Sequence, residues 1–330
     1  MTSTQDFNTQ LKQVFGRIFG NAMAEPKFKR LSGGASQETW AISDGENQAI
    51  LRRAPGGHAR EQSSAAINLN QEAELIAAAG LEGVPVPKIL HVLSAEDGLG
   101  EGFLMSKIEG ETIARPILRD DRFEDARKKL PAQCGSALAQ IHAVPIANLN
   151  ELPHSDGLQQ LERYEEIYRG FDVPRPIFEL AMAWLKKHAP TPLEPVLVHG
   201  DFRLGNLMID QEGLAAVLDW ELAHIGDPRE DISWICVNSW RFGQTDNRVG
   251  GFGHLEPLLA AYAAARGVEL TPTDIDWWEM LGSLKWGVMC MLMYEAFRSG
   301  SDPSVERAAI GRRVSETEID LVNLLEQAHA

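Results

Sequence analysis

Polar residues that could carry chemistry gather in one stretch of the second half of the chain. The segment from His199 to Asn206 reads His-Gly-Asp-Phe-Arg-Leu-Gly-Asn, and Asp219 follows thirteen residues later. Phosphoryl transfer from a nucleotide needs a carboxylate that orients and deprotonates the attacking hydroxyl. It also needs a second carboxylate and a carbonyl oxygen that hold magnesium against the phosphates. Asp201, Asn206 and Asp219 supply these groups, so the spacing predicts phosphoryl transfer.

Short apolar runs predict the strands that would position these side chains. Each run is four to five residues long, and a Gln-Glu-Gly turn joins the last two: 196–199, 206–210 and 214–218. Such strands would place Asp201 and Asn206 at the two ends of one tight loop and Asp219 at the end of the next strand. The side chains of Asp201, Asn206 and Asp219 would then lie around one opening between the loop and the strand end.

The rest of the chain divides into a strand-rich first part and a helical second part. β-prone runs separated by glycine-rich turns predict an antiparallel meander over 27–53, with two more strands at 89–93 and 102–108. Apolar residues at helical spacing predict helices at 7–18, 69–80, 123–144, 159–168 and 177–188, and from 255 to the end. We therefore expect a small lobe over residues 1–106 and a larger helical lobe over 107–330.

Three motifs together carry a resemblance to a known family. They are the His199 to Asn206 stretch, Asp219-Trp-Glu, and Gly-Asp227-Pro-x-x-Asp231. As a set they resemble the aminoglycoside phosphotransferase and choline kinase group of small-molecule kinases, over about 31–240. The nearest branch is the one related to the kinase-like domains fused to acyl-CoA dehydrogenases. The resemblance implies an α+β, bilobal protein-kinase-like fold, with a small antiparallel-sheet N-lobe and a larger, mostly helical C-lobe.

The resemblance also implies an activity and roles for the motif residues. The expected activity is a Mg²⁺-dependent transfer of the γ-phosphate of ATP, or of GTP, to a hydroxyl of a small molecule, with a hydroxylated acyl compound as one option. Asp201 would be the catalytic base, and Asn206 and Asp219 the magnesium ligands. His199 would be a structural member of the loop. We expect Asp227 and Asp231 to cap helices or brace loops.

In the first lobe, kinases hold the phosphates with a strand lysine that pairs with a helix glutamate. This sequence has Arg52 at that register, and an arginine keeps the charge while adding a bidentate fork. Glu72 is the expected partner because it borders the apolar stripe of its helix, and Glu74 is the alternative. Arg53 would point to the opposite face of the strand and be solvated.

Two further segments of the first lobe are candidate nucleotide contacts. Backbone amides of the Gly-rich turn that ends at Ser36 could cover the phosphates, although a plain hairpin turn would have the same sequence. The segment 103–110 resembles the inter-lobe hinge, where the backbone of Ser106 and Ile108 would hold adenine with Met105 behind it. An ordinary edge strand is the alternative for this segment.

Composition excludes several other classes of protein. The chain has 330 residues, 44% hydrophobic and 24% charged, which is ordinary for a folded protein. A net charge of −16 argues against binding nucleic acid or an anionic membrane. Three widely spaced cysteines, the lack of an apolar leader and apolar runs too short for a bilayer favour the cytoplasm.

The sequence does not identify the small molecule that would accept the phosphate. Trp240, Arg241 and Trp286 are candidates for lining its pocket. Three acidic residues of a predicted helix could form a rim for a cationic substrate, or could equally be a solvated helix face: Asp274, Asp276 and Glu279.

Two other functions remain open at this point. The chain could be a nucleotide-binding module that has kept the fold and lost the reaction. It could also be a metal-dependent hydrolase with four ligands, namely His199, Asp201, Asp219 and His224.

Overall fold

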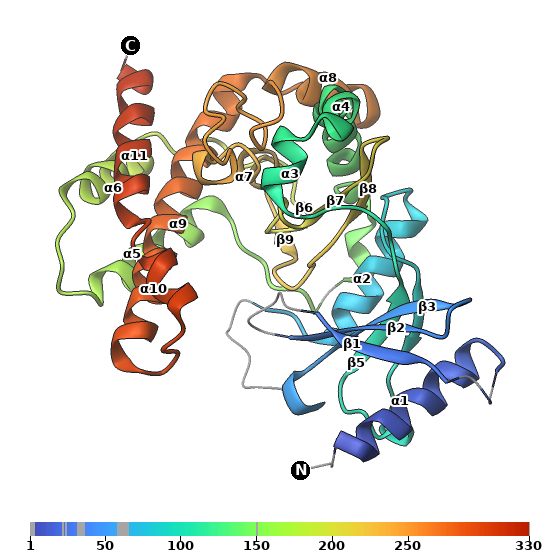
Figure 1. Ribbon diagram of the computed structural model, residues 1–330. Coiled ribbons are helices and arrows are strands. Elements are labelled where there is room, and N and C mark those ends of the chain that lie inside the picture. Colours follow the sequence, from blue (N-terminus) through green and yellow to red (C-terminus); the bar gives the residue numbers. More distant parts are fainter. Residues whose placement is uncertain are drawn as a thin grey trace.

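The computed structural model describes residues 4–21, 23, 25–31, 37–57, 66–149 and 151–329. Its N-terminal part is built on one antiparallel five-stranded sheet in the order β1-β2-β3-β5-β4 (Figure 1). The strands are β1 (Lys27–Arg30), β2 (Glu38–Ser43), β3 (Gln48–Arg53), β4 (Ile89–Val92) and β5 (Gly102–Ser106). This is the predicted meander followed by the two predicted later strands.

Helices cover both faces of this sheet, so alternate residues of each strand meet different helices (Figure 1). Helix α1 (Thr4–Ile18) shares one apolar cluster with Leu51 and Leu104, while α2 (Leu69–Leu81) shares another with Phe103. Asn68 caps α2 through a capping box with Gln71, which fixes where the helix begins. Side chains of β3 that point toward α2 can therefore meet groups of that helix.

The predicted solvation of Arg53 is wrong. Arg53 does lie on the opposite face of β3 from Arg52, but its side chain is only 11% exposed. Its guanidinium lies 4.1 Å from the centre of the Phe7 ring of α1 and donates to Glu38 at 2.8 Å. An arginine side chain has a long apolar stem that can pack under a helix, and α1 provides that cover.

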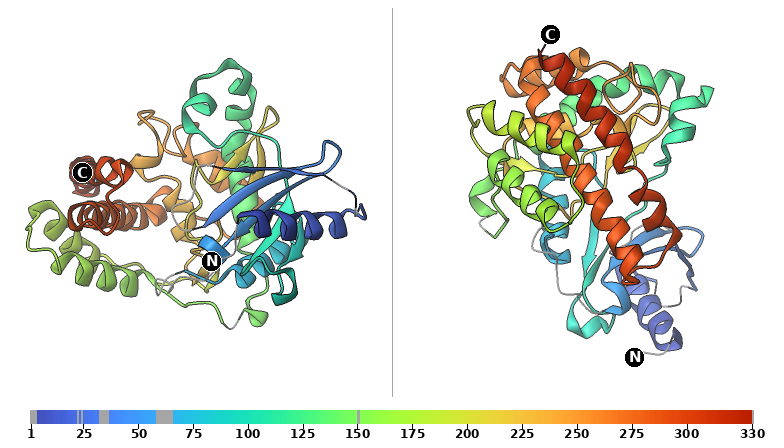
Figure 2. Two further views of the ribbon diagram at one scale, coloured as in Figure 1. Left: turned by 60° about the horizontal axis from the view of Figure 1, so that its bottom comes forward. Right: turned by 90° about the vertical axis from the view of Figure 1, so that its left-hand side faces the viewer.

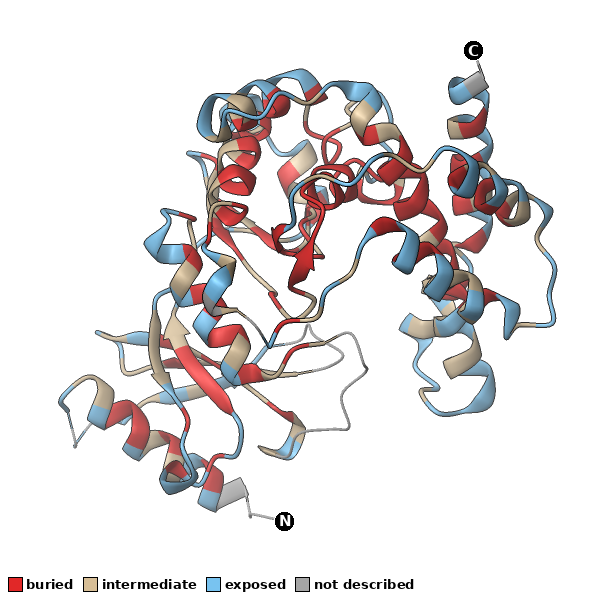
Figure 3. Cartoon of the chain, turned by 180° about the vertical axis from the view of Figure 1, so that it is seen from behind, coloured by how far each residue is buried: buried red, intermediate tan, exposed pale blue. Residues whose placement is uncertain are grey.

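The C-terminal part is mostly helical. Its helices are α3 (Ala114–Arg119), α4 (Glu124–Ile141), α5 (Gly157–Arg169), α6 (Pro176–Lys187), α7 (Arg229–Trp234), α8 (Leu255–Arg266), α9 (Pro272–Ser299), α10 (Val305–Gly311) and α11 (Val314–His329). Figure 2 shows α9 and α11 running side by side. Figure 3 shows buried residues concentrated at the centre of this part and on the inner sides of its helices. The tryptophans and methionines of α9 pack mainly into this core.

Four short strands lie inside the helical part. β7 (Leu207–Ile209) and β8 (Leu214–Val217) form the predicted hairpin, and β6 (Val196–Val198) pairs with β9 (His224–Gly226). The sequence did not predict β9 or α7. No helix in the described part of the chain has the length and apolar character needed to cross a bilayer.

Candidate active site

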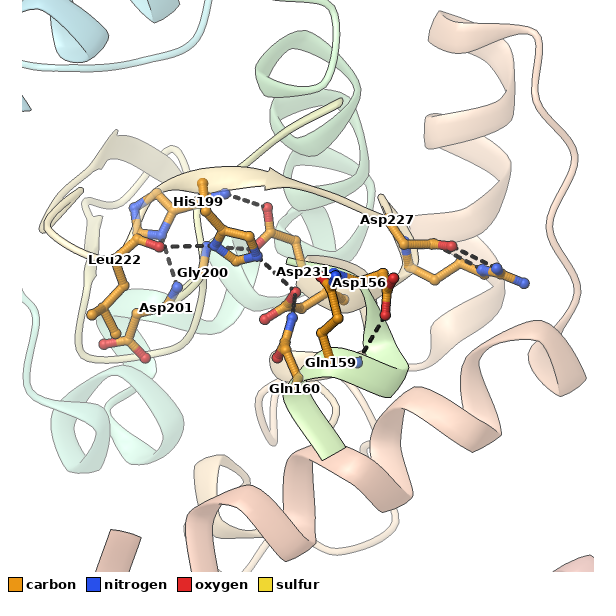
Figure 4. Close-up of polar contacts among 12 residues, drawn as sticks. Asp156, Gln159, Gln160, His199, Gly200, Asp201, Leu222, Asp227 and Asp231 are labelled. Atoms are coloured by element: carbon orange, nitrogen blue, oxygen red, sulfur yellow. Dashed lines mark hydrogen bonds and ion pairs between the residues drawn. The ribbon is translucent and has the colours of Figure 1, made fainter. Parts of the chain in front are cut away.

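The loop between β6 and β7 is braced by a buried aspartate of α7. Asp231 is fully buried, and its two carboxylate oxygens accept the backbone N–H groups of His199 (2.7 Å) and Gly200 (2.9 Å) (Figure 4). Gly200 has φ +81°, and a Cβ built there would lie 2.4 Å from the carbonyl oxygen of Leu222. Only glycine allows this close approach. The expectation that Asp231 braces a loop is confirmed.

His199 connects the loop to the neighbouring hairpin. Its Nε2 lies 3.1 Å from the carbonyl oxygen of Leu218, and its Nδ1 lies 3.2 Å from the backbone nitrogen of Asp201. Burial lowers the pKa of the fully buried imidazole. These partners fit the neutral tautomer that donates from Nε2 and accepts at Nδ1. The role of His199 is therefore structural, and both ring nitrogens are occupied.

The carboxylate of Asp201 is held by three donors and is still 14% exposed. Its Oδ1 accepts Nε1 of Trp234 at 2.7 Å and Nε of Arg203 at 2.9 Å, and its Oδ2 accepts Nδ2 of Asn206 at 2.6 Å. A fixed and partly accessible carboxylate can accept a proton from a bound hydroxyl group.

Asn206 and Asp219 lie at the same end of the β7–β8 hairpin. The backbone oxygen of Asn206 accepts the N–H of Leu218 at 2.8 Å, and Asp219 follows directly. Asp219 has φ +67°, a left-handed conformation that aspartate tolerates better than most residues, and its side chain is 32% exposed. Because Nδ2 of Asn206 bonds to Asp201, the amide oxygen is the end left for a ligand.

The oxygen donors of Asn206 and Asp219 suit Mg²⁺, which prefers carboxylate and carbonyl ligands and usually keeps water or substrate phosphates as well. The described residues hold no group of three or more His, Cys, Asp or Glu side chains arranged around a metal position. A divalent cation here would thus depend on phosphate oxygens for the rest of its coordination shell.

Arg52 of β3 reaches across from the first lobe to this hairpin. Its Nε lies 3.1 Å from Glu72 of α2, and its Nη2 lies 2.6 Å from Asp219 and 3.3 Å from Glu221. The structure therefore pairs Arg52 with Glu72, whereas Glu74 is exposed. The side chains of Arg52 and Glu72 are only 14% and 2% exposed, and burial disfavours the charged form of each.

The three carboxylates around Arg52 outweigh the effect of burial, and the pKa of Arg52 lies above its ordinary value. Burial raises the pKa of Glu72 to about 7 against the attraction of Arg52, and the charges of Asp219 and Glu221 add to this rise. The guanidinium is therefore a fixed cation, while the carboxyl group of Glu72 is sensitive to the charges around it.

The predicted hinge residues lie at and beyond the end of β5. The backbone N–H of Ser106 donates to the carbonyl oxygen of Lys88 at 2.8 Å, so this N–H already has an acceptor within the protein. Its hydroxyl oxygen accepts the N–H of Lys88 at 2.9 Å. Ile108 follows β5 and is partly exposed. The turn that contains Ser36 lies outside the described residues.

Three residues of the site were not singled out from the sequence. Glu221 was visible as the last residue of the Asp-Trp-Glu motif, and Arg203 as a cation inside the loop. Trp234 lies one helical turn after Asp231, but nothing in the local sequence indicates that its indole reaches back 33 residues to Asp201.

The acidic residues of α9 do not form a rim for a cationic substrate. Glu279 is buried and pairs with Arg241 and Arg248. Asp276 pairs with Arg248 at 2.6 Å, and Asp274 accepts the N–H of Thr271 at the start of the helix. Each of the three carboxylates therefore has a partner within the chain, and only that of Glu279 is buried.

Arg241, a candidate for the acceptor pocket, donates to the carbonyl oxygen of Cys236 at 2.9 Å and to Glu279, and its side chain is 13% exposed. The four hydrolase ligands are not assembled, because His224 instead lies 3.0 Å from Glu230 and both nitrogens of His199 have other partners.

Comparisons with known proteins agree with this geometry. Residues 27–271 match the phosphotransferase enzyme family. Mouse acyl-CoA dehydrogenase family member 10 is 30% identical over 235 residues, which cover 68% of this chain and 22% of that protein. Human acyl-CoA dehydrogenase family member 11 is 24% identical over 313 residues, 87% of this chain and 39% of that protein. The chain thus spans only about a fifth to two fifths of the length of these relatives.

Solved structures share the fold. A structure from Ralstonia eutropha JMP134, of a protein assigned as an aminoglycoside phosphotransferase, superposes with a TM-score of 0.74 at 20% identity and covers 97% of this chain and 98% of that one. Spectinomycin phosphotransferase in complex with ADP and spectinomycin superposes with a TM-score of 0.64 at 12% identity, covering 95% and 98%. The antiparallel sheet followed by a mostly helical part is therefore a kinase-like fold.

Proposed function

The chain belongs to the phosphotransferase enzyme family, and on this premise we propose that it is a Mg²⁺-dependent small-molecule kinase. It would transfer the γ-phosphoryl group of ATP, with GTP as the alternative, to an alcohol. One observation carries the proposal: Asp201 and Asn206 are bonded together beside the hairpin end that presents Asp219, and Arg52 reaches Asp219 from the other lobe. These contacts support a site in which a base, two oxygen donors for a metal and a cation lie close together.

In the proposed reaction, Asp201 orients the acceptor hydroxyl and takes its proton as the oxygen attacks the γ-phosphorus. The bond from that phosphorus to the bridging oxygen breaks, and the nucleoside diphosphate leaves. Asn206 and Asp219 would hold Mg²⁺, which neutralises phosphate charge when it is bound. Arg52, kept in place by Glu72, would supply a second positive charge near the phosphates. Most of the catalysis would then come from positioning and electrostatics.

The adenine would lie against the end of β5. Because the N–H of Ser106 is taken by Lys88, its carbonyl oxygen is the group that would accept from the base, and the backbone of Ile108 would complete the contact. The Ser36 turn would cover the phosphates. The ADP complex of spectinomycin phosphotransferase, a structure of similar fold, supports a nucleotide site on this fold.

For the acceptor we propose a hydroxylated acyl compound in place of a polycationic amino sugar. The acidic side chains of α9 that could bind amino groups already bond to Arg241, Arg248 or Thr271, which lie outside the helix. The groups near Asp201 include a donor and an aromatic ring: Arg203 bonds to Asp201, and its guanidinium lies 4.6 Å from the centre of the Trp240 ring. Donors and aromatic faces suit an apolar molecule that carries oxygen acceptors. Similarity to acyl-CoA dehydrogenase family members supports the same class.

Thermal unfolding with ATP, GTP or ADP, with and without Mg²⁺, tests the nucleotide site. A ligand at a hundred times its Kd should stabilise the protein by about 2.7 kcal/mol. We expect a Mg²⁺-dependent shift in the wild type that Asp219→Asn removes. A shift of equal size in EDTA would contradict the proposed metal role.

A coupled assay of nucleoside diphosphate release then tests the reaction and the acceptor class. Hydroxy acids and hydroxyacyl-CoA compounds should be phosphorylated, whereas kanamycin should not. If the protein binds nucleotide but phosphorylates none of these acceptors, the alternative is favoured: a nucleotide-binding module that has kept the fold and lost the reaction.

A further inference from the structure

We propose that Trp234 is a positioning residue for Asp201, held in place by a buried ion cluster of Lys285, Glu230 and His224. The inference rests on the proposed function of Asp201 as the base. It adds a residue from a different helix to the site and identifies which carboxylate oxygen takes the proton.

The indole of Trp234 makes a short bond to the carboxylate. Trp234 is the last residue of α7 and is 4% exposed, and its Nε1 donates to Oδ1 of Asp201 at 2.7 Å. Gly282 of α9 makes room for the ring, because a Cβ built there would lie 3.3 Å from Cε3 of Trp234. A buried ring confined by two packed helices has little rotational freedom, so its N–H points in one direction.

The donors around Asp201 leave its two oxygens unequal. A carboxylate oxygen has about two lone-pair positions. Trp234 and Arg203 fill both positions on Oδ1, whereas Oδ2 receives only the bond from Asn206. Oδ2 therefore keeps a free position, and we assign it as the atom that accepts the proton of the acceptor hydroxyl. Without the indole bond, the carboxylate could rotate and this assignment would be lost.

A buried cation lies over the same indole ring. Nζ of Lys285 is 5.2 Å from the centre of the Trp234 ring and 2.9 Å from Oε1 of Glu230. Oε2 of Glu230 lies 3.0 Å from Nε2 of His224 and 2.6 Å from the amide nitrogen of Gln160. Glu230 and His224 are buried, and the side chain of Lys285 is 12% exposed.

Buried ion pairs are weak contributors to stability, so their presence favours a role in placing neighbouring groups. The ammonium group attracts the π-electrons of the indole, which fixes the ring and makes its N–H a stronger donor toward Asp201. Within the described part of the chain, the ion pairs of this cluster do not include Arg52, Asn206 or Asp219. Lys285 also attracts the Asp201 carboxylate directly, so the cluster would act on the base both through Trp234 and through its own charge.

Three variants separate a donor role from packing. Trp234→Phe removes the N–H and keeps an aromatic ring, while Trp234→His is smaller than Phe but can place Nε2–H where the indole N–H was. Trp278→Phe is the matched control, because Trp278 is 3% exposed in the same core cluster and its Nε1 has no partner.

We expect kcat to fall on the order of 10-fold to 100-fold in Trp234→Phe, because misplacing a catalytic group has costs of this size. Trp234→His should recover several-fold over Trp234→Phe, whereas a packing role would make Phe the better replacement. The Mg²⁺-dependent thermal shift with ATP should persist in all three variants, and Trp278→Phe should keep the wild-type kcat. A Trp234→Phe enzyme with wild-type kcat, or a His variant slower than the Phe variant, would overturn the proposal.

A second measurement does not depend on turnover, so it separates this inference from the proposed function. In protein labelled with ¹⁵N-tryptophan, the indole resonance that disappears in Trp234→Phe belongs to Trp234. Asp201→Ala should move that resonance and speed its exchange with solvent, while the indole resonance of Trp278 should stay in place. A Trp234 resonance that is unaffected by Asp201→Ala would show that the bond is absent, and the inference would be wrong even if the kinase activity were found.

Discussion

Nη2 of Arg52 lies 2.6 Å from Oδ1 of Asp219, and this contact joins strand β3 of the sheet to the end of the β7–β8 hairpin, 167 residues further along the chain. The same nitrogen lies 3.3 Å from Glu221, and Nε of Arg52 lies 3.1 Å from Glu72. One guanidinium thus contacts three carboxylates and lies between the sheet and the hairpin.

Removing the positive charge of Arg52 should destabilise the protein. In Arg52→Met, three carboxylates would face one another without compensation, and breaking a buried charge pair costs about 3–5 kcal/mol. Arg52→Lys should lose less, because it keeps the charge but not the fork that reaches Glu72 and Asp219 together. Urea unfolding measures both variants. The exposed Arg119→Met is the control and should stay within about 0.5 kcal/mol of the wild type. An Arg52→Met protein as stable as the wild type would show that the contact adds nothing.

Replacing the proposed base should remove turnover and leave nucleotide binding. Asp201→Ala should lower kcat by about 10²-fold to 10⁴-fold, the usual contribution of a general base. The Mg²⁺-dependent thermal shift with ATP should remain, because Arg52, Asn206 and Asp219 are unchanged. The exposed Asp172→Ala is the matched control and should keep full activity. A kcat within a few-fold of the wild type in Asp201→Ala would rule out its role as base.

The sequence predicted those features that follow from the spacing of apolar residues within one strand or helix. The hairpin followed from alternating apolar runs, and the choice of Glu72 over Glu74 followed from the position of Glu72 on its helix. Packing between distant segments could not be predicted in the same way. Arg53 is covered only because α1 lies over the sheet, and Trp234 meets Asp201 only because α7 packs beside the loop.

The contacts of the acidic residues of α9 could not be predicted from the sequence either. Glu279 and Asp276 of α9 pair with arginines that precede them by 28 to 38 residues, so the helix sequence alone could not distinguish a solvated face from an internal ion network. Net charge was therefore no guide to the acceptor.

The brace formed by Asp231 should matter for both stability and catalysis. Asp231→Ala would leave the buried N–H groups of His199 and Gly200 without an acceptor, and each such group costs about 1–3 kcal/mol. We expect a loss of roughly 2–5 kcal/mol in urea unfolding and a lower kcat, because the loop also holds Asp201. Asp274→Ala, which removes only a helix cap, should cost about 1 kcal/mol and leave kcat unchanged. Equal effects of the two substitutions would contradict the bracing role.

Asp97 should make the stability of the first lobe depend on pH. Burial alone would raise its pKa, but the N–H of Ser94, the ring of His91 and the guanidinium of Arg17 outweigh burial and lower the pKa from 3.8 to about 2. A folded-state pKa below the unfolded one stabilises the protein above about pH 4. This stabilisation is lost as the pH falls toward 2.

The difference between the two pKa values corresponds to about 2 kcal/mol. Asp97→Asn should therefore reduce the free energy of unfolding by about that amount at pH 7, and its curve should converge with that of the wild type between about pH 4 and pH 2. Urea unfolding at a series of pH values measures both curves, with the exposed Asp246→Asn as a control that should follow the wild type throughout. A gap between the Asp97→Asn and wild-type curves that stays constant down to pH 2 would mean that the lost contacts are independent of the carboxylate charge.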